Sequence, residues 1–228
     1  MAPQSKTSRV PQPTKGDYVH TLAKAGISAI PVIGGPGVEL FSWLMQPPLE
    51  RRKAAWMEAV GEKLAELEAN GVDLKLLQEN DQFVSAVMHA TTLALRAHET
   101  EKLEALRNAL VNIAMGQEPN EARRHFFLEC VGSLSELHLR ILRLFQKPPG
   151  LRNATMGGLS HVLEQEIPNL RGFRYLYDQF WNDLFARGLV GTSSLHTTMS
   201  ANGLKDKRTT DLGDMFLGFI SEYPRPAA

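Results

Sequence analysis

Side chains that can bind a metal ion are scattered along this sequence rather than grouped in a motif. The seven histidines and the single cysteine form no HExxH, paired ExxH or CxxC pattern, and protein metal sites need ligands at such spacings. His125 and Glu129 are four residues apart, and His161 and Glu164 are three apart. Pairs of this kind are typical of contacts on a helix surface. We therefore predict no metal site and no cofactor.

The sequence also shows no pattern for nucleophilic catalysis or phosphate binding. Cys130 lies among Phe126, Phe127 and Leu134 on the apolar side of an expected helix, which is typical of a buried small side chain rather than a reactive thiolate. There is no GxSxG elbow or P-loop, and residues 34–37, GGPG, lack the lysine of a phosphate loop. We predict that the protein is not an enzyme, and an enzyme of unfamiliar type is the third hypothesis.

The least polar part of the chain is residues 25–38, AGISAIPVIGGPGV, with no charge, two prolines and four glycines. Exposing apolar surface to water costs about 25 cal/mol per Å², so this segment must be covered by protein or lipid. It is too short for a membrane-spanning helix, which needs about 20 apolar residues. Its prolines and glycines also argue against a secretory signal. The candidate residues for binding a membrane or partner are Ile27, Ile30, Val32, Ile33 and Val38.

Composition and charge favour a globular protein without a broad basic surface. The chain has 228 residues, 43% of them hydrophobic and 22% charged, and its formal net charge is zero. Only the N-terminal tail is basic; residues 1–16 are predicted to be a disordered tail that can assist binding to anionic lipid. One cysteine excludes an internal disulfide framework. We expect a cytoplasmic protein, with peripheral attachment to the inner membrane as one option.

The elements that must position these residues are predicted to be mainly helical. Residues 17–147 are expected to form a helical bundle with short connections. A short helix over 39–45 is expected to stop at Pro47-Pro48, and apolar spacing predicts a second helix over 49–69. The longest helix is expected from Pro119 to about Phe145.

Residues 151–222 are predicted to form a winged-helix-like unit with a β-hairpin. Helices are expected over 158–166 and 171–187, a strand over 194–200 with a turn at Asn202-Gly203, and a last helix capped by Thr210 or Asp211. Basic side chains at the hairpin tip suggest nucleic-acid binding as the alternative function: Lys205, Lys207 and Arg208. Asp178 and Asp183 in the helix that would face DNA argue against it.

Five phrases of the sequence resemble a widespread family of uncharacterised bacterial helical proteins. These phrases lie at residues 30–56, 101–112, 137–145, 177–190 and 194–220. The GLV of residues 188–190 followed by TDLGDMFLGFI (210–220) also resembles the C-terminal third of the abortive-infection alpha proteins of phage defence. The resemblance implies a helical bacterial protein and offers no catalytic residues.

Together these patterns predict a non-catalytic interaction protein, with phage defence implied by the resemblance. A protein partner or a second copy of the chain is the expected partner, a membrane surface is the next candidate, and nucleic acid is the least favoured. The apolar segment 25–38 is the expected contact, and a winged-helix DNA-binding regulator is the alternative.

Overall fold

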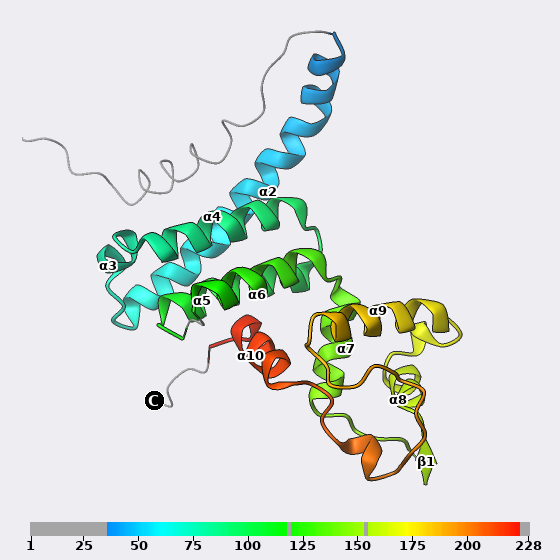
Figure 1. The fold of residues 1–228 in the computed structure, drawn as a ribbon. Helices are drawn as coiled ribbons and strands as arrows, with labels where there is room; N and C mark the ends of the chain where they lie inside the picture. The colour runs from blue at the N-terminus through cyan, green and yellow to red at the C-terminus, as the bar shows by residue number, and fades with distance from the viewer. Residues whose placement is uncertain (1–35, 118–119, 153–154, 224–228) are drawn as a thin grey trace, which may run out of the picture. The chain divides into compact units, whose positions relative to one another are not determined.

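The computed structural model describes residues 36–117, 120–152 and 155–223, with side chains described from residue 40 onward. The chain divides into two compact units, residues 1–62 and 63–228, and each is described by itself. The described residues are mainly helical with one small antiparallel sheet, which confirms the predicted fold class. Figure 1 traces the order of the helices from α2 to α10.

A single long helix, α2 (Pro36–Ala69), replaces the two helices predicted for this part of the chain. The expected stop at Pro47-Pro48 is wrong, because both prolines lie inside α2. Proline fixes φ near a helical value, so the helix can continue, but proline has no N–H to donate. The carbonyls of Trp43 and Leu44, four residues earlier, therefore lack their usual amide donors.

Four further helices form the first part of the second unit, and Figure 1 shows α4, α5 and α6 side by side. Asn80 caps α4 by accepting from two backbone N–H groups. Small buried side chains lie on the facing helices α4 and α5, which lets their backbones approach closely: Ala86, Ala90, Ala94, Ala105 and Ala109. The bounds are α3 (Leu74–Gln78), α4 (Asp81–Arg96), α5 (Thr100–Ala114) and α6 (Glu121–Ser133).

The long helix predicted from Pro119 to Phe145 is also wrong, because the structure breaks it after α6. Leu134 has an extended backbone, and α7 (Glu136–Gln146) begins two residues later. The backbone N–H of Ser135 donates to Nδ1 of His138 at 3.1 Å, so a side chain takes the place of a helical carbonyl. The apolar spacing continues across this break and so gave no sign of it.

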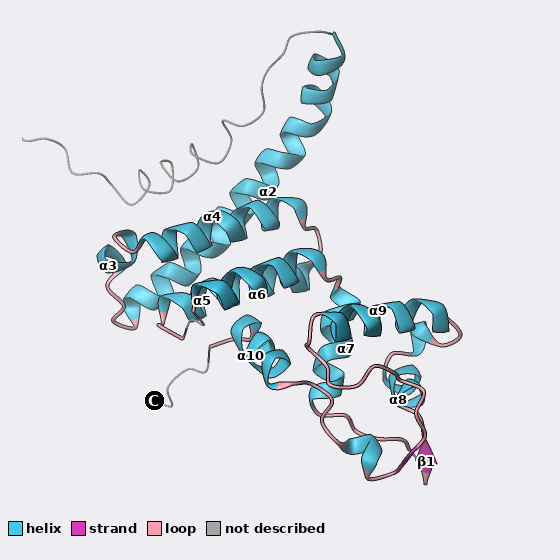
Figure 2. Cartoon of the chain, viewed as in Figure 1, coloured by secondary structure: helices cyan, strands magenta, loops and turns pink. Residues whose placement is uncertain are grey.

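The remaining elements include a two-stranded sheet, drawn in magenta in Figure 2. Met156 pairs with Ser200 and Gly157 with Met199 in antiparallel register. The chain turns at Asn202-Gly203 as predicted, but the turn is not that of a hairpin. Gly203 opens a 3₁₀ helix, and β2 pairs with β1 far earlier in the chain. The bounds are β1 (Met156–Gly157), α8 (Leu159–Glu166), η1 (Pro168–Leu170), α9 (Arg174–Ala186), β2 (Met199–Ser200), η2 (Gly203–Lys205) and α10 (Asp211–Ile220).

Helix α10 returns the chain to α5 and closes the core of the second unit. The side-chain amide of Asn112, which is buried, donates to the carbonyls of Phe219 and Ser221 at 2.9 and 3.0 Å. The ring of Phe127 lies 5.5 Å from both Phe216 and Phe219, measured between centroids. These contacts cover the C-terminal end of α10 with polar and aromatic partners.

The first turn of α10 is packed so closely that only glycine fits at residue 213. A Cβ on Gly213 would lie 2.1 Å from the carbonyl oxygen of Leu189. Replacing Gly213 with alanine should therefore lower the free energy of unfolding by about 2 kcal/mol, the usual cost of overpacking a rigid site. Urea denaturation followed by circular dichroism measures this change.

Gly218 of the same helix is the matched control, because a Cβ there meets nothing within 4 Å. Gly218→Ala should be neutral or stabilise the protein by up to about 1 kcal/mol, since alanine favours the helix. Equal effects of the two substitutions would contradict the close contact between Gly213 and Leu189.

Candidate functional site

Most of the residues predicted to bind a membrane or partner lie outside the described part of the chain. Ile27, Ile30, Val32 and Ile33 precede residue 36, where the description begins. Val38 lies in the first turn of α2, where only the backbone is described. The apolar-segment hypothesis therefore stays a prediction for these five residues.

The structure adds a neighbouring apolar surface that the sequence patterns missed. Residues 40–45 of α2, LFSWLM, are all exposed, and we call this stretch the apolar arm. Its large side chains are 45–74% exposed, with Trp43 at the upper end. A run of exposed apolar side chains of this size is uncommon in a monomer and usually marks a binding surface.

The apolar arm presents its hydrophobic side chains around more than half of the helix. At 100° per residue, the five apolar side chains of the arm cover an arc of roughly 200° around the helix axis. They are Leu40, Phe41, Trp43, Leu44 and Met45. Ser42 and the adjoining Gln46, four residues apart, lie on the remaining face. The arm is therefore amphipathic, with an apolar face wider than a core-facing helix normally needs.

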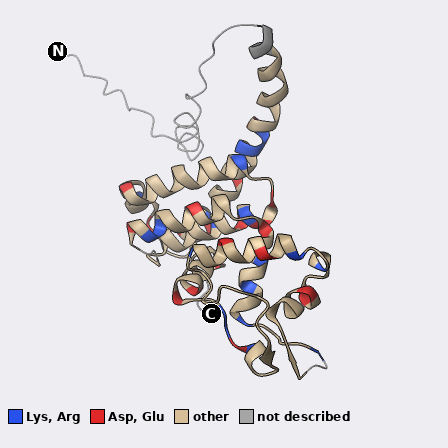
Figure 3. Ribbon diagram, turned by 45° about the vertical axis from the view of Figure 1, so that its right-hand side comes forward, with Lys and Arg blue, Asp and Glu red and all other residues tan. Residues whose placement is uncertain are grey.

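Basic side chains follow the apolar arm directly after the two prolines. Arg51 and Arg52 are exposed, and Lys53 is partly exposed, against two acidic residues, Glu39 before the arm and Glu50 after it. In Figure 3 the ribbon of the arm is tan, and it turns blue where these basic residues begin. The local charge therefore favours an anionic surface next to the apolar face.

The second candidate surface, the basic residues near β2, is largely occupied by contacts within the chain. Nζ of Lys207 lies 2.5 Å from Oδ2 of Asp214. The guanidinium of Arg208 donates to the carbonyl of Gly203, and its Nε is buried. The aliphatic chain of Lys205 lies where a Cβ on Gly150 would be. Lys205 and Lys207 are exposed and Arg208 is partly buried, and nucleic-acid binding stays a prediction for these three residues.

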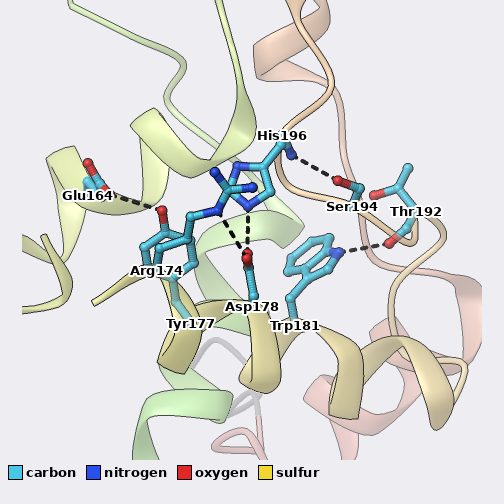
Figure 4. Close-up of polar contacts among 8 residues, drawn as sticks. All are labelled: Glu164, Arg174, Tyr177, Asp178, Trp181, Thr192, Ser194 and His196. Carbon is cyan, nitrogen blue, oxygen red and sulfur yellow. Dashed lines mark hydrogen bonds and ion pairs between the residues drawn. The ribbon is translucent and has the colours of Figure 1, made fainter. Parts of the chain in front are cut away.

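A polar cluster connects α9 to the loop that precedes β2, as Figure 4 shows. Nε2 of His196 lies 2.7 Å from Oδ1 of Asp178, and Nε of Arg174 lies 3.3 Å from Oδ2 of the same carboxylate. The indole N–H of Trp181 donates to the carbonyl of Thr192 at 2.8 Å. Asp178 thus has two partners, and the cluster fastens the loop to the helix.

A second hydrogen bond in the cluster joins α9 to α8. The hydroxyl of Tyr177 donates to Oε1 of Glu164 at 3.0 Å. Burial and the neighbouring carboxylate raise the pKa of Tyr177 to about 12, so the phenol keeps its proton at neutral pH. The bond is therefore a structural contact between a neutral donor and a carboxylate.

The described residues hold no arrangement that favours a metal or a reactive thiol. Among residues 36–117, 120–152 and 155–223, no three His, Cys, Asp or Glu side chains are placed to share a metal ion. Burial raises the pKa of Cys130 to about 11, which keeps the thiol protonated near neutral pH. Across the same ranges, every helix is either too short or too polar to cross a bilayer.

No family model, curated protein or solved structure matches this chain. The resemblance to uncharacterised bacterial helical proteins and to abortive-infection alpha proteins therefore stays a prediction, as does a role in phage defence.

The polar cluster supplies a test of how the loop before β2 is held. Asp178→Ala should lower the free energy of unfolding by about 1 kcal/mol, because it removes the partner of the half-buried His196. Arg174→Ala should cost less than about 0.5 kcal/mol, since its side chain is 68% exposed. Urea denaturation at pH 7.5 compares the two variants, and a larger effect of Arg174→Ala would contradict this assignment.

Proposed function

We propose that this protein is a non-catalytic binding protein that attaches to the surface of an anionic membrane through the apolar arm. The observation that carries the proposal is the exposure of Leu40, Phe41 and Trp43 to Met45 on one helix. The apolar residues 25–38 precede the arm in the sequence and are separated from it by Glu39 alone. Water is an unfavourable environment for this surface, so a binding partner is expected to cover it.

The width of the apolar face favours lipid over a protein groove. A groove covers one side of a helix through anchors at i, i+3 or i+4 and i+7, whereas here the hydrophobic side chains span roughly 200°. A helix lying in the membrane interface buries a broad apolar face and keeps a polar face toward water. Ser42 and Gln46 supply that polar face.

The basic residues after the prolines suit the headgroup region of an anionic membrane. Each Lys or Arg close to such a surface contributes about 1 kcal/mol to binding. Arg51, Arg52 and Lys53 follow the arm along α2, and we expect their long side chains to reach phosphate groups. Trp43 suits the boundary between acyl chains and headgroups. The hydrophobic contribution to membrane binding, from the arm, and the electrostatic contribution, from residues 51–53, therefore come from neighbouring parts of α2.

Vesicle binding by the full chain tests the proposal. The protein should co-sediment with phosphatidylcholine vesicles that contain phosphatidylglycerol. Replacing Trp43 and Leu44 with Asp should lower the partition coefficient at least tenfold, because each buried side chain contributes about 1.5–3 kcal/mol. Leu76→Asp in α3 is the control, since Leu76 is also exposed, at 67%, but lies outside the arm.

The charge contribution is measured in the same assay. Changing Arg51, Arg52 and Lys53 to Gln should weaken binding to anionic vesicles roughly fivefold per residue. Binding to vesicles without phosphatidylglycerol should be weak for every variant. Two results would overturn the proposal: no binding to any vesicle, or binding that survives the Asp substitutions. A dimer in solution that the Asp substitutions dissociate would show that a second copy covers the arm instead.

A further inference from the structure

The joint between α6 and α7 depends on a histidine in a position that normally holds Glu or Gln. His138 is the third residue of α7, and its Nδ1 accepts the backbone N–H of Ser135 at 3.1 Å. Oγ of Ser135 lies 2.7 Å from the same nitrogen. This is the reciprocal arrangement of a capping box, in which the third side chain of the helix reaches back to the cap residue.

The donors around the ring fix the proton state in which this box forms. A backbone N–H can only donate, so Nδ1 must carry no proton. The proton of the neutral ring then lies on Nε2, which faces Oδ2 of Asp183 in α9 at 3.3 Å. Glu and Gln accept hydrogen bonds throughout the neutral and mildly acidic range, whereas histidine stops accepting at Nδ1 once it is protonated.

The surroundings of His138 resist a positive charge. Its side chain is 8% exposed, and its ring lies 4.5 Å from the ring of Phe180. Asp183 favours the imidazolium, while Arg187 at the end of α9 and Lys102 of α5 disfavour it. Burial has the largest effect, and it lowers the pKa of His138 below its ordinary value. The positive end of the α7 dipole acts in the same direction.

A second histidine makes the same bond in an exposed setting. Nδ1 of His161 accepts the backbone N–H of Gly158 at 3.1 Å at the start of α8. His161 is exposed, so its ring can turn toward water. The buried ring of His138 has no such alternative, and the two hydrogen bonds form a natural comparison.

We propose that His138 is a pH-sensitive latch that holds the start of α7 to the backbone N–H of Ser135 only while its Nδ1 is unprotonated. Protonation replaces an acceptor with a donor, so the hydrogen bond from the backbone N–H of Ser135 is lost, whereas Oγ of Ser135 can accept from the new N–H. Mild acidification therefore weakens the α6–α7 joint, and with it the packing of α7 against α9. The latch is independent of the membrane-binding proposal.

The direction of the pH effect follows from the lowered pKa of His138 in the folded protein. The unfolded chain, with a histidine pKa of about 6.5, takes up the proton first as the pH falls. The contribution of His138 is fully present above about pH 6.5 and is lost as the pH falls toward the folded-state pKa. Within that window the unfolding equilibrium constant rises by up to about tenfold per pH unit from this one site.

Urea unfolding at pH 7.5 and pH 5.5 tests the latch in the full chain and two variants. His138→Gln keeps a side-chain acceptor for Ser135 at both pH values, so its unfolding constant should rise less on acidification than that of the parent, by several-fold. His161→Gln should change with pH as the parent does. Equal pH dependence in the parent and His138→Gln would overturn the proposal.

A proton NMR titration of the folded parent provides a second measurement, which does not require the variant to fold. The ring resonance of His138, assigned from backbone-linked spectra, should titrate with a midpoint below 6.5. Chemical shifts of the Ser135 amide should move with the same midpoint, because that N–H loses its acceptor. A midpoint at or above 6.5, or a Ser135 amide that does not respond, would overturn the latch.

Discussion

The end of α10 imposes the constraint on which the second unit most depends. The last carbonyls of a helix have no amide donors within it, and burying them without partners costs about 1–3 kcal/mol each. Helix α5 supplies the donors: Asn112 bonds the carbonyls of Phe219 and Ser221, and Asn108 bonds that of Ile220. Because a side-chain amide can donate only along fixed directions, these bonds determine where α10 ends on α5. The aromatic contacts of Phe127 with α10 follow from that position.

The apolar arm differs from the second unit in how many large apolar side chains it exposes on one short stretch. In the second unit, the buried amide of Asn112 has partners, and exposed large apolar side chains such as Leu76 are dispersed along the chain. In the arm, by contrast, Leu40, Trp43 and Leu44 are exposed close together on one helix. A helix needs an apolar stripe only about 100° wide to pack on a core, and the arm exceeds this. Selection for folding alone does not account for such a surface, and this is why we assign it to binding rather than to packing.

Helices with local signals were predictable from the sequence, and features that depend on distant residues were not. Of the two caps predicted for the last helix, the structure shows Thr210, and the helix predicted over 158–166 is present as α8 (Leu159–Glu166). Both predictions follow from neighbouring residues. The break before Ser135 was missed because the apolar spacing continues through it and histidine is not a usual capping-box residue. The partner of β2 was missed because pairing with β1 depends on contacts far apart in the chain. At the candidate site, residues 25–38 were predicted to bind a partner because they carry no charge. The arm was not predicted, because Glu39 ends the uncharged segment and Pro47 was expected to end the helix.

Pro47 and Pro48, at which a helix end was wrongly predicted, also limit how deep the arm can lie in a membrane. Pro47 and Pro48 deprive the carbonyls of Trp43 and Leu44 of helical donors. A backbone carbonyl without a donor costs several kcal/mol in hydrocarbon but little near water or headgroups. Under the membrane proposal, these two carbonyls therefore belong at the polar boundary, while the side chains of Phe41 and Leu44 enter the acyl region. The same two prolines thus favour a helix lying in the interface over one that inserts along its axis.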